Sequence, residues 1–190
     1  MNSLNSQNYT TQNDLLMNNL MEYYKDETNL NRMLKIITGE CKISLRIVDW
    51  FATNYAKKYY TLFDIEVGES VRRFKVYVDY KLKLKAYSKR RFDPFCRWDR
   101  ISIPYKNGTC IETTIGQLNF FKWALENKVV DYIENNYETI EKDMNSRNST
   151  SKRKEQIVDN SKTRKKREEL SVSAIKSIKK EKVEIVVQFH

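Results

Sequence analysis

Hydrophobic residues recur every three to four positions between residues 14 and 60, as they do in amphipathic helices. We therefore predict helices over residues 14–25, 29–38 and 43–60. Gly39 stands where a helix C-terminus favours glycine, and Ser44 stands where its hydroxyl can cap the third helix. This third helix carries an apolar and aromatic stripe that predicts a role in core packing.

The pattern changes to alternation of apolar and polar residues after position 60, which is typical of half-buried strands. Residues 61–67 and 71–80 predict two strands joined by a turn at 68–70. Tyr80, Leu84 and Tyr87 also fit helical spacing, so residues 81–91 stay open between strand and helix.

Residues 92–95 interrupt both patterns because Pro94 fixes its own φ and restricts Asp93. Short strands are predicted over 101–105 and 109–113, on either side of an Asn-Gly pair that strongly favours a hairpin. Pro104 lacks a backbone donor and predicts that the first of these strands lies at a sheet edge. Helices follow over 114–127, with Thr114 as N-cap and Gln117 completing a capping box, and over 129–144.

These elements predict an α+β fold: N-terminal helices, a small antiparallel sheet with an Asn-Gly hairpin, two C-terminal helices and a basic extension. We expect a disordered N-terminus over 1–12, a core domain over 13–144, and a basic flexible linker over 145–169. Residues 170–190 form a docking segment, predicted as a helix over 170–180 and a strand over 183–189. That strand could pair with the chain's own sheet or add to a neighbouring subunit.

The net charge of +10 is concentrated in two blocks of the chain. Residues 72–100 hold 11 Lys and Arg against 3 Asp and Glu, and residues 145–190 hold 13 against 6. The remainder is mildly acidic. Such asymmetry predicts an anionic partner: nucleic acid, an acidic protein surface such as that of a capsid protein, or a membrane face.

Several chemistries are disfavoured by the residues themselves. The single histidine is His190, so no Ser-His-Asp or Cys-His pair can form without the last residue. Phosphate loops are absent from the sequence, and Cys41, Cys96 and Cys110 are too scattered for a zinc knuckle or a disulfide framework. We expect no enzyme activity, no cofactor, no metal, no small-molecule substrate, no signal peptide and no membrane span.

One enzymatic pattern stays open as an alternative. Asp64, followed a hairpin's length later by Asp79-Tyr80-Lys81, resembles the sparse signature of the PD-(D/E)xK nuclease fold, in which two carboxylates hold Mg²⁺. The proline that this signature places before the first acid is missing. Two solvent-facing charges on a basic strand explain the same residues.

The candidate binding site is basic and interleaved with aromatic residues. Lys and Arg contact phosphates, and exposed aromatic rings stack on unpaired bases. The alternative is that the rings belong to the core and the cations line a subunit interface. The predicted contact residues are Lys81, Lys83, Lys85, Lys89, Arg90, Arg91, Arg97, Trp98 and Arg100, with Arg164, Lys165, Lys166 and Arg167 in the tail.

Four blocks of the sequence resemble a family of small basic proteins of nucleocytoplasmic large DNA viruses, the giant viruses of algae and protists. The blocks are ISLRIVDWFATNYAKK (43–58), LKAYSKRRFDPFCR (84–97), TTIGQLNFFKWALEN (113–127) and RKKREELSVSAIKS (164–177). The resemblance implies a viral protein of the cytoplasmic replication and assembly environment. It implies no activity and assigns no functional residue.

Together these observations predict a non-enzymatic viral protein that binds nucleic acid through the basic, aromatic turn and the Lys/Arg-rich tail. The alternative is a structural virion component, such as a minor capsid protein whose C-terminal extension links neighbouring subunits. A Mg²⁺-dependent nuclease is the third hypothesis. The expected location is the virion and the viral factory in the host cytoplasm.

Overall fold

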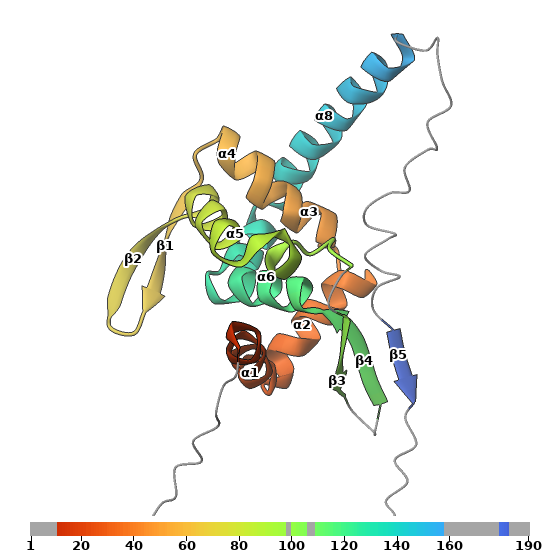
Figure 1. Cartoon of the computed structure of the whole chain (residues 1–190). Helices are drawn as coiled ribbons and strands as arrows, with labels where there is room; N and C mark the ends of the chain where they lie inside the picture. The colour runs from red at the N-terminus through yellow and green to blue at the C-terminus, as the bar shows by residue number, and fades with distance from the viewer. Residues whose placement is uncertain (1–10, 98–99, 106–108, 158–178, 183–190) are drawn as a thin grey trace, which may run out of the picture.

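A computed structural model describes residues 11–97, 100–105, 109–157 and 179–182 of the 190-residue chain. Within these ranges helices are combined with two small antiparallel sheets (Figure 1), which confirms the predicted α+β class. The elements in chain order are α1 (Gln12–Tyr24), α2 (Glu27–Thr38), α3 (Leu45–Trp50), η1 (Phe51–Tyr55), α4 (Ala56–Lys58), β1 (Leu62–Val67), β2 (Ser70–Lys75), α5 (Val76–Phe92), β3 (Arg100–Pro104), β4 (Thr109–Thr114), α6 (Ile115–Glu126), α7 (Val129–Asn135), α8 (Tyr137–Ile157) and β5 (Lys179–Lys182).

Helix ends follow the predicted capping chemistry. Gly39 ends α2 at φ +76°, in the left-handed region that glycine tolerates best. Ser44 caps α3 by accepting a hydrogen bond from the backbone N–H of Ile47, and Thr114 caps α6 by accepting one from Gln117. The Gln117 side chain accepts a hydrogen bond from the Thr113 hydroxyl at 3.0 Å.

Helix α6 lies at the centre of the molecule (Figure 1), and 10 of its 12 residues are buried. It packs against α1, α2, α5, α7 and β4. A helix that is apolar on all sides is stable only when surrounded by other elements. The aromatic rings around it form one contact network with centroids 5.6–6.5 Å apart: Phe74, Tyr80, Phe92, Phe120 and Trp123.

The strand predicted over 71–80 is wrong beyond Lys75, because α5 begins at Val76 and continues through the undecided residues 81–91. β2 pairs with β1 from Ser70 to Lys75, and β1 begins at Leu62 opposite Lys75. A strand continuing past Lys75 would have no partner for its backbone groups, whereas a helix satisfies them internally. The backbone N–H of Val76 closes the junction by donating to the carbonyl of Thr61 at 3.3 Å.

Other boundaries also differ from prediction. The helix predicted over 43–60 contains a π-helical segment, η1, and the helix predicted over 129–144 is interrupted at Asn136. Asn136 donates its side-chain amide to the carbonyl of Tyr132 at 2.9 Å, which satisfies an end group of α7. α8 runs on through Ile157, so the first part of the predicted flexible linker is helical.

The second sheet has the order β3-β4-β5, with both pairs antiparallel. The predicted hairpin strands are confirmed, and β3 with Pro104 lies at the sheet edge as expected. β5 pairs with β4 over Lys179–Lys182, so helix is wrong for residues 179 and 180. The predicted turn at Asn107-Gly108, the segment 170–178 and the strand over 183–189 lie outside the described residues.

Candidate functional site

Helix α5 carries six of the predicted contact residues: Lys81, Lys83, Lys85, Lys89, Arg90 and Arg91. No acidic residue interrupts the sequence between Asp79 and Asp93. Because α5 packs on α6 and on η1, its remaining surface divides into two parts, an exposed outer face and a flank that faces α1. The cations are distributed between these two surfaces.

The outer face of α5 combines lysines with exposed aliphatic side chains. Lys81 and Lys85 lie one helical turn apart beside Val78 and Leu82, which are 53% and 61% exposed. A shallow groove of about 520 Å³ runs along this face, lined by Tyr77, Val78, Lys81, Leu82, Leu84 and Lys85. Lys81, Lys85 and Lys89 form no ion pair with any of the described residues.

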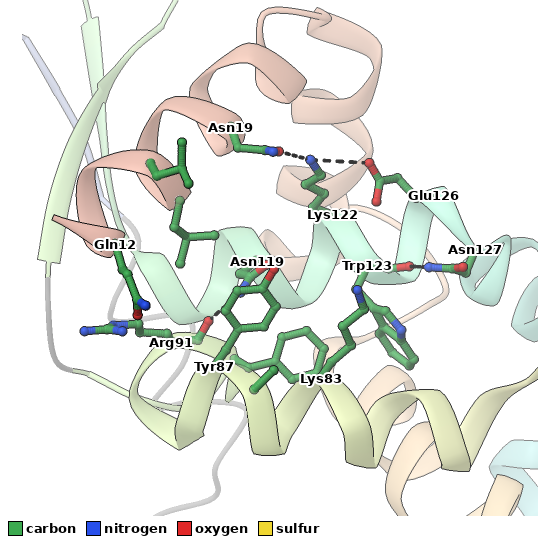
Figure 2. Close-up of a pocket in the computed structure, with 14 residues that line it drawn as sticks. Gln12, Asn19, Lys83, Tyr87, Arg91, Asn119, Lys122, Trp123, Glu126 and Asn127 are labelled. Atoms are coloured by element: carbon green, nitrogen blue, oxygen red, sulfur yellow. Dashed lines mark hydrogen bonds and ion pairs between the residues drawn. The ribbon is translucent and has the colours of Figure 1, made fainter. Parts of the chain in front are cut away.

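The α1-facing flank of α5 lines a pocket of about 510 Å³ between α1, α5 and α6 (Figure 2). Lys83 and Tyr87 lie one helical turn apart on this flank, and Arg91, which follows the kink at Ser88, lines the same pocket, so the pocket wall presents a cation, a ring and a second cation. The full lining is Gln12, Leu15, Leu16, Asn19, Lys83, Ala86, Tyr87, Arg91, Phe92, Asn119, Lys122, Trp123, Glu126 and Asn127.

Hydrogen bonds hold the three walls of the pocket together. The Tyr24 hydroxyl donates to the carbonyl of Leu118 at 2.8 Å, which fixes the C-terminal part of α1 on α6. The Asn119 amide donates to the carbonyl of Arg91 at 2.9 Å, and the Trp123 indole donates to Asp79 at 2.7 Å. α5 is therefore attached to α6 at both of its ends.

The pocket has an excess of positive charge. Lys122 contacts Asn19 and forms an ion pair with Glu126 at 3.4 Å, so its charge is balanced within the pocket. The side chains of Lys83 and Arg91 are half-buried and make no hydrogen bond or ion pair with another described residue. Two cations are thus left for an external anion.

The other predicted contact residues are not gathered on this helix. Arg97 is exposed, and Arg100 forms an ion pair with Glu112 across the β3-β4 hairpin at 3.2 Å. Phe92, which directly follows Arg91 in the basic and aromatic stretch of the sequence, is a fully buried core residue and cannot stack on a base. Trp98 and the tail cluster Arg164, Lys165, Lys166 and Arg167 lie outside the described residues.

The acids of the nuclease pattern are not arranged as that pattern requires. Asp79 lies on a helix, not at the end of a strand, and accepts the hydrogen bond from the Trp123 indole. Asp64 accepts from Arg73 at 3.1 Å on the exposed β1-β2 hairpin. Helix residues two apart do not face each other, so Asp79 and Lys81 are directed to different surfaces. No group of three or more potential metal ligands occurs within the part of the chain that the structure describes.

A second electrostatic feature lies beneath α5. Burial, with a contribution from the negative charge of Asp93, raises the pKa of Asp49 to about 7. Burial also raises the pKa of Tyr80, with Asp49 and Asp93 adding to the effect. Asp49 and Asp93 do not line the pocket described above.

Sequence reasoning counted Tyr87 among the aromatic residues interleaved with the basic cluster, but it missed the contribution of α1. With α5 assigned as a helix, the four-residue spacing would have indicated that Lys83 and Tyr87 share a surface, whereas the place of Arg91 depends on the kink at Ser88. No sequence signal placed Gln12 and Asn19 opposite that surface, since this depends on how α1 packs against α6.

A family model described as "Family of unknown function (DUF7197)" matches residues 1–190. The chain belongs to this family. It is 45% identical over 129 residues to "Uncharacterized protein L507" of Acanthamoeba polyphaga mimivirus, with 65% of this chain and 50% of the relative aligned. The chain thus spans about half the length of the curated relative that it matches.

The mimivirus relative confirms the resemblance to an uncharacterised giant-virus family and supports a viral origin for this DUF7197 member. No solved structure matches the chain. Among the helices that the structure describes, none combines the length and apolar character needed to cross a bilayer.

Proposed function

We propose that this protein is a non-enzymatic viral protein that binds nucleic acid through α5. The observation that carries the proposal is that Lys81, Lys85 and Lys89 of α5 are all exposed and have no carboxylate partners among the described residues. Cations that are not neutralised by their own protein are the groups that replace the counterions of a phosphate backbone.

The shape of α5 supports contacts over an extended region. Ser88 has φ +64° and ψ 167°, which kinks the helix before its last turn. The kink redirects the turn that holds Lys89, Arg90 and Arg91 relative to the preceding part. Arg97 is a further exposed cation after the helix, and we propose that the tail cluster at 164–167 adds phosphate contacts in the virion or the viral factory.

The test is binding to plain duplex and single-stranded DNA and RNA over a range of salt concentrations. The triple variant Lys81→Gln, Lys85→Gln, Lys89→Gln should weaken binding and flatten the dependence of log affinity on log salt by about 3 on duplex DNA. A matched control is Lys25→Gln, Lys35→Gln, Lys142→Gln, which removes three exposed charges from the residue after α1, from α2 and from α8. Absence of binding by the native protein at about 0.1 M salt, or equal losses in both triple variants, would refute the proposal.

A second candidate function is docking on an acidic capsid-protein surface, and the exposed Val78 and Leu82 favour it. Exposed aliphatic side chains gain from burial against a protein, whereas a phosphate backbone offers them little. The double variant Val78→Ser, Leu82→Ser separates the two functions. It should bind nucleic acid like the native protein under the first proposal, and lose association with purified genome-free capsids under the second.

A further inference from the structure

We infer that the pocket between α1, α5 and α6 binds one nucleotide, with its phosphate on Lys83 and Arg91 and its base against Tyr87. The inference deepens the proposed function by naming a site for an unstacked nucleotide, and it also applies to a free mononucleotide. It rests on the proposed function only where the nucleotide belongs to a polymer.

The first support is the state of the two cations. Lys83 and Arg91 are half-buried in the pocket wall and have no hydrogen-bonding or anionic partner among the described residues. Withdrawing a charge from water without pairing it is unfavourable, so both groups gain when an anion enters. The planar guanidinium of Arg91 can donate two parallel hydrogen bonds to phosphate oxygens, and Lys83 adds a point charge.

The second support is the aromatic residue between the cations. The Tyr87 ring stacks on the fully buried Phe92, with centroids 6.1 Å apart and planes 22° apart, so its orientation is fixed by the core. Its hydroxyl has no partner among the described residues. Figure 2 shows Tyr87 rising from α5 toward α6 and α1. A fixed ring beside a cation is the arrangement on which single bases stack.

The third support is the opposite wall. Leu15 and Leu16 of α1 supply apolar surface, and Leu15 is 54% exposed although it lines the pocket. Gln12 and Asn119 can hydrogen-bond a base edge. Asn119 would use its side-chain oxygen, because its amide nitrogen already donates to the carbonyl of Arg91. The volume of about 510 Å³ lies within the range of pockets for ligands of nucleotide size.

The experiment measures binding of the full chain by isothermal titration calorimetry to three probes: adenosine monophosphate, a short single-stranded oligonucleotide and inorganic phosphate. The pocket variant is Lys83→Gln, Arg91→Gln, and the matched control is Lys81→Gln, Lys85→Gln, which removes two cations from the outer face of the same helix. Tyr87→Leu tests the stacking contact separately.

The expected result is that the pocket variant loses adenosine monophosphate affinity by about tenfold or more, while the outer-face control changes it less than about twofold. Tyr87→Leu should lose about tenfold for the mononucleotide and leave phosphate binding unchanged. Circular dichroism melts of each variant show whether a loss of binding reflects unfolding. If Tyr87→Leu does not fold, Leu15→Trp, which fills the pocket from the exposed side of α1, tests whether the mononucleotide occupies this pocket and should weaken its binding.

The outcomes separate this inference from the proposed function. If the protein binds the mononucleotide but not the polymer, the inferred nucleotide site in the pocket stands and the proposed function is refuted. Polymer binding that the outer-face variant weakens, together with no mononucleotide binding, refutes the pocket and retains the proposed function. Phosphate binding as tight as that of the mononucleotide, with no effect of Tyr87→Leu, also refutes the nucleotide assignment.

Discussion

At the scale of single residues, two aspartates show how the environment sets the state of a carboxyl group. Burial and the nearby Asp93 raise the pKa of Asp49 to about 7. Burial of Asp143 also favours the neutral form, but hydrogen bonds from Lys58, Trp50 and Tyr59 outweigh it and hold its pKa below the usual value. Asp143 thereby links the α3-α4 region to α8, whereas ionisation of Asp49 is unfavourable in the folded protein.

Asp49→Asn should therefore stabilise the protein at high pH. An acid whose pKa is raised on folding contributes stability that is fully present below about pH 4 and is lost as the pH rises through 7. The neutral amide removes this loss, so the variant should gain on the order of 4 kcal/mol relative to the native protein between pH 4 and pH 8. Urea unfolding at both pH values measures the gain.

The control for this experiment is Asp143→Asn, which should behave in the opposite way. The lowered pKa of Asp143 means that its contribution is present above about pH 4 and lost at lower pH, so this variant should be most destabilised near neutrality. Equal pH profiles for Asp49→Asn and the native protein would contradict the assigned state of Asp49.

At the scale of elements, the orientation of α5 depends on a close approach to α6. A Cβ atom on Gly116 would lie 2.7 Å from the carbonyl oxygen of Asp93 and 3.3 Å from that of Arg90. Both neighbours are backbone atoms at the end of α5, so they cannot move away as a flexible side chain would. The hydrogen bond from Asn119 to the carbonyl of Arg91 lies one turn further along the same contact.

Gly116→Ala should therefore destabilise the protein, although alanine is the better helix former by about 1 kcal/mol. The methyl group must displace the end of α5, and such overpacking costs about 1–3 kcal/mol. Thermal unfolding measures the sign. The comparison variant is Ala86→Gly at an exposed position of α5, which should show the ordinary loss of about 1 kcal/mol. A more stable Gly116→Ala protein would mean that α5 does not approach α6 this closely.

At the scale of the whole molecule, the C-terminal extension returns to the body of the protein. β5 pairs with β4 from Thr109↔Lys182 to Glu112↔Lys179, so β4 is covered on both sides within the described part of the sheet. An uncovered edge strand would offer its backbone groups to other chains. Residues 179–182 pair with the chain's own sheet, whereas the predicted choice between this sheet and a neighbouring subunit concerned residues 183–189, which lie outside the described residues.

Truncation after residue 178 should expose the outer edge of β4. Amide hydrogen exchange of residues 109–112 should become faster, since the partner strand is gone, while exchange in α6 stays slow because α6 is buried independently of β5. Size-exclusion chromatography should show increased self-association of the truncated chain. Unchanged exchange at 109–112 would show that β5 does not cover this edge in solution.

Only part of the candidate site followed from the sequence. Composition and spacing identified the cations of residues 81–91, because charge is a property of the residues themselves. They did not show that Lys81 and Lys85 lie on an outer face while Lys83 and Arg91 line a pocket. That division requires knowing that the segment is helical and which side of it meets α6.

The sequence by itself determined the elements whose signals are local: the capped helices beginning after Ser44 and Thr114, the end of α2 at Gly39, and the short hairpin strands β3 and β4. Tertiary structure alone decided where β2 gives way to α5. The sequence after Lys75 fits both an alternating and a helical pattern. The helix is favoured because β1 begins at Leu62, opposite Lys75, so a longer β2 would have no partner strand. Tertiary structure also decided the pocket, because Gln12, Tyr87 and Asn119 meet only through packing between helices far apart in the chain.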